Sequence, residues 1–201
     1  GDLLRLTSTN GSSGGAQIDL MHFSASPANG DDHGIINFGG YYSGTTQAYG
    51  SSIRGAWNGV GAREGQLHFY TRKGSSFTEK MRLTEDGHVL IGKTSVDNST
   101  VGCRFNATGD ASFVADGNRA LVVVRKSSDG EMALFLKDST TIGKITTRSD
   151  QFAIGKAGTG IEFNDANDAV IPFSPNANNT RDNALDLGMS SVRWDDIYAT
   201  N

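Results

Sequence analysis

The sequence predicts an all-β protein built from short strands joined by tight turns. Apolar and polar residues alternate in many short stretches, the pattern of half-buried strands. Glycine occupies 26 of 201 positions, nearly twice its average share of about 7%. Glycine supplies the positive φ angles that tight turns need. No stretch has the periodicity of a helix longer than two turns, and 3 prolines with no block of like charge argue against a disordered chain.

Strand signals begin close to the N-terminus. Residues 3–6 and 18–23 are apolar stretches on either side of a Ser- and Gly-rich segment, which predicts a hairpin. Residues 25–34 have the composition of a loop. Residues 35–62 combine glycines with aromatic residues, and they predict short strands separated by glycines. A helix is excluded there because each glycine would destabilise it by about 1 kcal/mol relative to alanine.

The clearest hairpin signal surrounds an Asp-Gly turn. Met81 and Leu83 lead into Thr84-Glu85-Asp86-Gly87, and Val89 and Ile91 follow. The same layout recurs between Phe105 and Ala111, with Gly109 in the place of Gly87. A further strand is predicted at 67–71, before the first hairpin, because apolar and polar residues alternate there. Further strands are predicted at 121–124, 132–136, 142–147, 152–154 and 161–163, with a turn at 127–130.

The chain is expected to consist of a β-rich region at 1–182 and a C-terminal packing segment at 183–201. Leu185, Leu187 and Met189 alternate as in a half-buried strand, whereas residues 194–198 fit a turn or a second strand. Many strand edges and little side-chain bulk favour coverage by another copy of the chain, in an obligate oligomer of intertwined sheets. The residues expected to pack there are Leu185, Leu187, Trp194, Ile197 and Tyr198.

Composition excludes several classes of function. A net charge of −4 argues against a nucleic-acid partner, since phosphate binding needs clustered Lys and Arg. The longest apolar runs, 120–124 and 132–136, are too short to insert into a membrane as a helix. Cys103 is the single cysteine, so neither a disulfide nor a thiolate zinc site is expected. No cofactor is expected, because the Ser- and Gly-rich segment lacks the lysine of a phosphate loop.

Metal-binding and catalytic patterns are weak. Two clusters carry metal-ligand residue types without an established spacing, so no metal is expected; they are Asp31-Asp32-His33, and Asn164 and Asp165 with Asp168. No nucleophile elbow is expected to accompany His22, His33, His68 or His88, because the Gly-x-Ser-x-Gly spacing at 11–15 is not followed by a predicted helix. Glycoside hydrolysis requires a pair of carboxylates, and no pair stands out among Glu64, Glu79, Glu131 and Glu162. The chain is therefore not expected to be an enzyme.

Two stretches resemble tailed-phage fibre proteins. Within residues 53–95, Ile53-Arg54-Gly55, the run from Gly65 to Thr71 and the run from Met81 to Thr94 resemble a module common in these fibres. The pattern of that module ends in M-R-L/I-x-x-x-G-x-V-x-I-G. Leu185-Asp186-Leu187-Gly188, Arg193-Trp194 and Ile197-Tyr198-Ala199 resemble the segment that precedes the self-cleaving intramolecular chaperone of tail fibres and tailspikes. The resemblance is closest to the L-shaped tail fibres of T-five-like siphophages.

This resemblance implies a homotrimeric fibre tip that attaches to bacterial surface polysaccharide, which is O-antigen for the L-shaped fibres. It implies a location at the tail-fibre tip of the virion, after synthesis in the cytoplasm of the bacterial host. In that family the chaperone cuts itself off after folding, and Asn201 lies where the residue before the cut would be. The cleavage chemistry belongs to the chaperone, so the resemblance assigns no catalytic residue to this chain.

An aromatic segment is the best candidate for receptor binding. Tyr41, Tyr42, Tyr49 and Trp57 lie among Gly, Ser, Thr, Asn and Gln, a composition suited to stacking on sugar rings while hydrogen-bonding their hydroxyls. The alternative is that these rings pack in the core or between subunits. Loops at 25–34, 73–78 and 174–182 are further surface candidates. The competing functions are a polysaccharide depolymerase and a purely structural fibre shaft.

Overall fold

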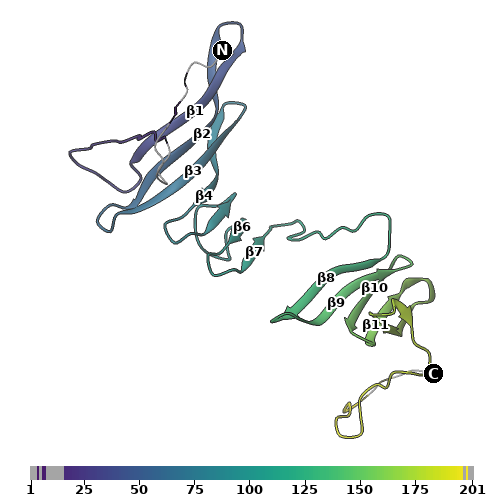
Figure 1. Cartoon of the computed structure of the whole chain (residues 1–201). Coiled ribbons are helices and arrows are strands. Elements are labelled where there is room, and N and C mark those ends of the chain that lie inside the picture. Colours follow the sequence, from purple (N-terminus) through teal and green to yellow (C-terminus); the bar gives the residue numbers. More distant parts are fainter. Residues whose placement is uncertain (1–3, 5, 8–15, 197, 199–201) are drawn as a thin grey trace. The chain divides into compact units, whose positions relative to one another are not determined.

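The computed structural model describes residues 4, 6–7, 16–196 and 198, and it divides into two compact units, Gly1–Leu121 and Val122–Asn201 (Figure 1). Each unit contains one antiparallel sheet, which confirms the all-β prediction. Within the described residues the only helix is the 3₁₀ turn η1 (Asp165–Asn167), as expected from the missing helical periodicity. The sequence predicts one boundary, after residue 182, and it does not predict the boundary between the two units after residue 121.

Unit 1 is a meander in which every strand pairs with its neighbours in sequence. Its strands are β1 (Asp32–Ser43), β2 (Thr46–Gly59), β3 (Glu64–Lys73), β4 (Ser76–Leu83), β5 (Val89–Ile91), β6 (Gly102–Phe105) and β7 (Ala111–Val114). The loop predicted at 25–34 therefore extends three residues too far, because β1 begins at Asp32. The prediction of short strands at 35–62 was wrong, because β1 and β2 run for 12 and 14 residues with glycines inside them.

These glycines make room for side chains instead of ending strands. Gly39 lies opposite Tyr49 in the β1–β2 ladder. A Cβ atom at Gly39 would lie 2.6 Å from the Ala48 carbonyl oxygen and 2.9 Å from Cδ1 of Tyr49. A side chain at this position would displace the tyrosine ring, so glycine here permits close approach.

The two predicted Asp-Gly-type turns are confirmed. Gly87 has a φ of +82°, and its N–H donates to the Thr84 carbonyl over 3.0 Å. The turn before β7 has the same bonding: Gly109 has a φ of +96°, and its N–H donates to Asn106 over 3.0 Å. The recurring sequence layout thus encodes the same turn twice.

A clamp around a buried lysine fixes the loop between β5 and β6. The Lys93 side chain is fully buried, and its Nζ donates to the carbonyl oxygens of Asp97 and Thr100 over 2.6 and 3.2 Å. The Asp97 carboxylate in turn accepts from the N–H groups of Ser99 and Thr100 over 2.8 and 2.6 Å. These bonds satisfy the buried ammonium group, which would otherwise be costly.

Unit 2 is a second meander. Its strands are β8 (Gly130–Lys137), β9 (Thr140–Arg148), β10 (Gln151–Lys156), β11 (Thr159–Asn164), β12 (Ala169–Ser174) and β13 (Asn179–Thr180). The strands predicted at 132–136, 142–147, 152–154 and 161–163 are confirmed. Strands β12 and β13 were not predicted, and β13 lies within the loop expected at 174–182.

The strands predicted at 18–23, 121–124 and 185–189 are wrong. Residues 18–23 and 121–124 form no strand and are exposed, and the first half of the N-terminal hairpin, 3–6, lies largely outside the described residues. Strand β8 pairs with β9 and not with 121–124; the predicted turn at 127–130 is held instead by Arg125, whose Nε donates to the Ser128 carbonyl over 2.8 Å. The alternation at 185–189 ends in a turn at Gly188 and a single bridge between Met189 and Val192. Alternation alone does not make a strand where no neighbouring strand pairs with it.

Each sheet has one apolar and one mixed polar face, and the apolar face is the more exposed. In unit 2, Phe152 and Phe163 are opposite each other on β10 and β11 and remain 46% and 45% exposed. On the other face Ala153 and Glu162, also opposite each other, are fully buried. Across all described residues the only buried apolar side chains are Ala56, Leu90, Ala153, Phe173 and Pro175.

Unit 1 repeats this distribution. The strand register aligns an apolar row across its seven strands: Ile36, Ile53, Phe69, Met81, Ile91, Cys103 and Phe113. Ile36 and Ile91 of this row are exposed, whereas Ser52 and Leu90 on the opposite face are buried. The apolar rows therefore form broad surfaces that the single chain leaves uncovered.

Ion pairs make burial of the polar faces tolerable. Arg82 donates to both carboxylate oxygens of Glu79 over 2.6 and 2.7 Å in unit 1. In unit 2, Lys144 donates to Glu131 over 2.7 Å. Burying a charge is costly unless it is paired, and these pairs meet that condition.

Candidate functional site

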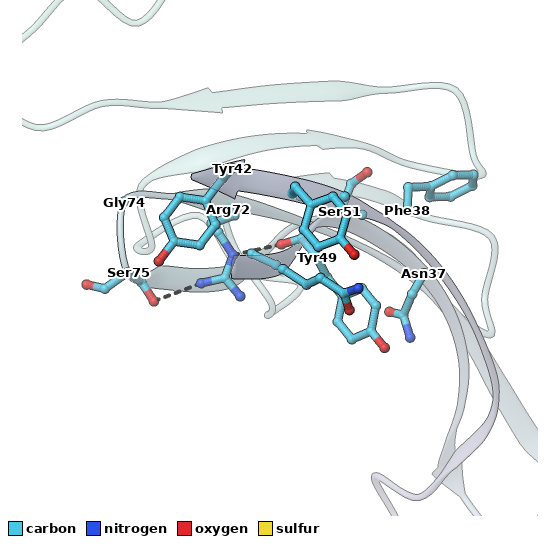
Figure 2. Close-up of a pocket in the computed structure, with 14 residues that line it drawn as sticks. Asn37, Phe38, Tyr42, Tyr49, Ser51, Arg72, Gly74 and Ser75 are labelled. Carbon is cyan, nitrogen blue, oxygen red and sulfur yellow. Dashed lines mark hydrogen bonds between the residues drawn. The ribbon is translucent and has the colours of Figure 1, made fainter. Parts of the chain in front are cut away.

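A groove of about 1610 Å³ lies at the end of the β1–β2 hairpin. Strands β1 and β2 form most of it, and the end of β3 and the β3–β4 turn complete it (Figure 2). The residues that line it are Asn37, Phe38, Gly39, Gly40, Tyr41, Tyr42, Gln47, Ala48, Tyr49, Gly50, Ser51, Arg72, Gly74 and Ser75. It is lined mainly by aromatic rings, amides, hydroxyls and glycines.

The groove contains three of the four residues predicted for receptor binding. Tyr41 and Tyr42 lie near the end of β1 and are 65% and 72% exposed. Tyr49 comes from β2, where its ring lies against Gly39, and it is 56% exposed. The turn between the strands is tight, because Ser43 pairs directly with Thr46 and Gly44 has a φ of +54°. The hairpin thus brings together rings that lie on both sides of a turn.

Trp57 does not belong to this groove. It pairs with Gly65 near the other end of β2, and its ring packs edge-on against His33 with centroids 4.2 Å apart. Eight residues of strand separate it from Tyr49, about 27 Å at roughly 3.4 Å per residue. Trp57 is half-buried, which agrees with the alternative that its ring packs within the protein and does not bind receptor.

Arg72 is a groove residue that the sequence analysis missed. Its Nε donates to the Tyr49 carbonyl over 2.7 Å, and its Nη1 donates to the Ser75 carbonyl over 3.3 Å (Figure 2). Its guanidinium carbon also lies 5.2 Å from the centre of the Phe77 ring. These contacts connect β2, β3 and the β3–β4 turn. The predicted surface loop at 73–78 gave a partial signal, since Gly74 and Ser75 form that turn and line the groove.

The groove can stack and hydrogen-bond a ligand, but its described lining contains no Asp or Glu. Tyrosine rings offer apolar faces with a polar edge, and amides and hydroxyls both donate and accept. Hydrolysis of a glycoside by the usual route needs two carboxylates about 5 to 9.5 Å apart. Those groups are not among the residues that line this groove.

The carboxylates considered for hydrolysis are mostly held by cations elsewhere. Glu79 is bound by Arg82, Glu131 by Lys144, and the fully buried Glu162 lies 3.7 Å from Arg148. His68 lies beside Glu79, with 3.9 Å between Nδ1 and the carboxylate. Burial lowers the pKa of His68, against the opposing effect of Glu79. In unit 1, His68, Glu79 and Arg82 form a half-buried polar network on the mixed face of the sheet.

The two clusters considered for metal binding serve local structure. Asp31 accepts from the Ala28 N–H over 2.8 Å, and Asp32 lies 3.4 Å from the Arg54 guanidinium. Asn164 caps η1 by accepting from the Asn167 N–H over 3.1 Å, and Asp168 ends that turn with a φ of +50°. In the part of the chain that the structure describes, no three His, Cys, Asp or Glu residues form a group able to hold a metal ion.

The residues predicted for subunit packing are largely exposed in the single chain. Trp194 and Leu187 are exposed, Tyr198 is nearly fully so, and Leu185 is half-buried. Ile197, together with Asn201 at the predicted cleavage position, lies outside the described residues.

None of the helices described is long and apolar enough to span a membrane. No protein-family model and no curated protein matches this sequence.

Proposed function

We propose that this chain is a receptor-binding tip of a tailed-phage fibre, which attaches to bacterial surface polysaccharide as a homotrimer. The observation that carries the proposal is the open groove in which Tyr41, Tyr42 and Tyr49 lie among amides and hydroxyls. The resemblance of the 53–95 and 185–199 stretches to phage fibres supports the same function.

The groove has the chemistry that a sugar requires. A pyranose ring presents apolar C–H faces and a rim of hydroxyls. Exposed tyrosine rings can stack on those faces, and Asn37, Gln47 and Ser51 can hydrogen-bond the hydroxyls. Each site would bind weakly, because sugar hydroxyls exchange water for protein partners at little net gain. Several copies on one particle would convert weak sites into firm attachment through effective concentration.

The uncovered apolar faces support the homotrimer. Monomeric proteins seldom expose contiguous apolar patches beyond a few hundred Å². Here each unit has an apolar row on the more exposed face of its sheet, exemplified by Phe152 and Phe163 in unit 2. Packing of equivalent faces from other copies would bury these rows, and it would supply the core that a single chain lacks.

Cell attachment tests the receptor-binding function. The chain should bind bacteria that carry O-antigen and should fail to bind O-antigen-deficient bacteria of the same strain. Replacing both Tyr41 and Tyr42 with alanine should lower binding at least tenfold while the oligomer persists. The control is Phe23→Ala, which removes an aromatic side chain that is 86% exposed and outside the groove. Equal binding by the double variant and the control would remove the groove as the receptor site.

The same preparation separates the two competing functions. A depolymerase would release shorter oligosaccharides from the purified polysaccharide, which mass spectrometry would detect. A structural shaft would bind no cells. The lack of Asp and Glu in the described groove lining favours binding without cleavage at this site.

A further inference from the structure

The cations and carboxylates of unit 1 are unevenly distributed around the groove. The whole chain has a net charge of −4, with 22 acidic and 18 basic residues. The two stretches that line the groove, residues 37–51 and 72–75, contain no Asp or Glu, and their charged residues are Arg72 and Lys73. The groove therefore lies in a locally positive part of an acidic protein.

Arg72 is the charged residue within the lining. The other two arginines of β2 to β4 are each paired with a carboxylate: Arg54 with Asp32 over 3.4 Å, and Arg82 with Glu79 over 2.6 Å. Arg72 forms no ion pair with any of the described carboxylates, and its side chain is exposed. Its charge is thus uncompensated at the position where a ligand would bind.

The orientation of Arg72 is fixed without using all of its donors. A guanidinium group carries five N–H donors. Two hydrogen bonds, to the Tyr49 and Ser75 carbonyls, hold the guanidinium group at the groove. The group also lies over the Phe77 ring, which helps to fix its orientation. A pre-oriented guanidinium with free donors matches the planar, bidentate recognition of carboxylate and phosphate.

We infer that the groove selects an anionic glycan, whose negatively charged substituent binds Arg72 while neighbouring sugar rings stack on the tyrosines. This inference rests on the proposed polysaccharide binding and names the class of polysaccharide. The anionic group is a sugar carboxylate, as in a uronic acid, or a phosphate substituent. Both offer the paired oxygens that a guanidinium recognises.

The test uses purified surface polysaccharide from a bacterial strain to which the chain binds. Three samples are immobilised: the native polymer, the polymer with its carboxylates reduced to alcohols, and the dephosphorylated polymer. One of the two treatments should lower the affinity of the wild-type chain about tenfold to a hundredfold, the range for losing a hydrogen-bonded charge. The treatment that does so identifies the anionic group, and binding to the native polymer should weaken as salt is raised.

Two variants test the role of Arg72. Arg72→Gln should reproduce the loss of affinity on the native polymer and should make the variant indifferent to the effective treatment. The matched control, Lys73→Gln, removes the same charge from the adjacent residue, which does not line the groove, and should retain most of the affinity.

The outcomes separate the inference from the function on which it rests. Equal wild-type affinity for all three samples would overturn the anionic-glycan inference and leave polysaccharide binding in place. Failure to bind any of the samples would overturn both. Because the treatments alter only the ligand, they remain decisive if Arg72→Gln disturbs the fold of the hairpin.

Discussion

The apolar face of unit 2 provides the sharpest test of assembly. Phe152 and Phe163 lie directly opposite each other on β10 and β11, with ring centroids 5.7 Å apart. Replacing Phe152 with lysine and Phe163 with glutamate places opposite charges at a cross-strand pair. Such pairs stabilise a sheet by roughly 0.2–1 kcal/mol relative to alanines, so the isolated sheet should tolerate the change. An apolar subunit interface should not tolerate two charged side chains.

The size of the effect follows from the exposure of the two rings. A phenylalanine buries about 200 Å² at most, so exposures of 46% and 45% leave about 90 Å² on each ring for a partner to cover. At about 25 cal/mol per Å² this burial is worth roughly 2 kcal/mol for each ring and 4 kcal/mol for each subunit. Because 1.4 kcal/mol corresponds to a factor of ten, the double change should weaken association by about a thousandfold per subunit.

Light scattering at micromolar concentration measures the outcome as a molar mass. The wild-type chain should give the mass of a trimer and the double variant that of a monomer, with the β-sheet signal retained in circular dichroism. Phe23→Lys, which alters an exposed ring outside both sheets, should leave the trimer intact. A monomeric wild-type chain, or an undiminished trimer in the double variant, would refute the assembly argument.

Two further predictions concern stability. Leu90 is fully buried on β5, so Leu90→Ala should lower the free energy of unfolding by about 2–5 kcal/mol and depress the melting temperature; a shift of less than about 1 kcal/mol would contradict its placement in the core. Hydrogen bonds from the Ser95 hydroxyl and the Thr100 N–H hold the pKa of Asp97 below its ordinary value. The stability that Asp97 contributes is therefore complete above its ordinary pKa of about 3.9 and is lost as the pH falls through the lower folded value. Melting temperatures of wild-type and Asp97→Asn should differ at pH 7 and converge towards pH 2, whereas a constant difference would rule out this linkage.

Local signals could be read from the sequence, and those that depend on register could not. The turn at Gly87 is predictable because the turn residues and both flanking strands lie within a dozen positions. Arg72 reaches the groove only through the pairing of β2 with β3 and the two-residue β3–β4 turn, and neither is evident in the residues around it. Tyr49 could be predicted as a candidate from its composition, but its closeness to Tyr41 depends on a hairpin whose glycines had been interpreted as strand ends.

The sequence also could not reveal which face of each sheet would be covered. Alternation in β10 and β11 predicts that Phe152 and Phe163 share one face and that Ala153 and Glu162 share the other. The usual expectation is that the phenylalanines are buried. In the single chain Glu162 is buried instead, with Arg148 Nε 3.7 Å from one of its carboxylate oxygens. The strands predicted at 18–23 and 121–124 failed for a related reason, since alternation records which side chains would share a face but not whether another strand is present to pair.

The meander topology has a consequence for how the proposed homotrimer would form. Because every strand pairs only with its neighbours in sequence, the sheets have low contact order, and each hairpin can form as soon as its two strands have left the ribosome. Sheet formation is then fast and unimolecular, whereas coverage of the apolar rows in the proposed homotrimer would require encounters between chains. For the proposed homotrimer, folded single chains with exposed apolar rows would therefore precede assembly, and their lifetime would shorten as chain concentration rises. Dilute synthesis would prolong that interval and favour capture by the wrong partner.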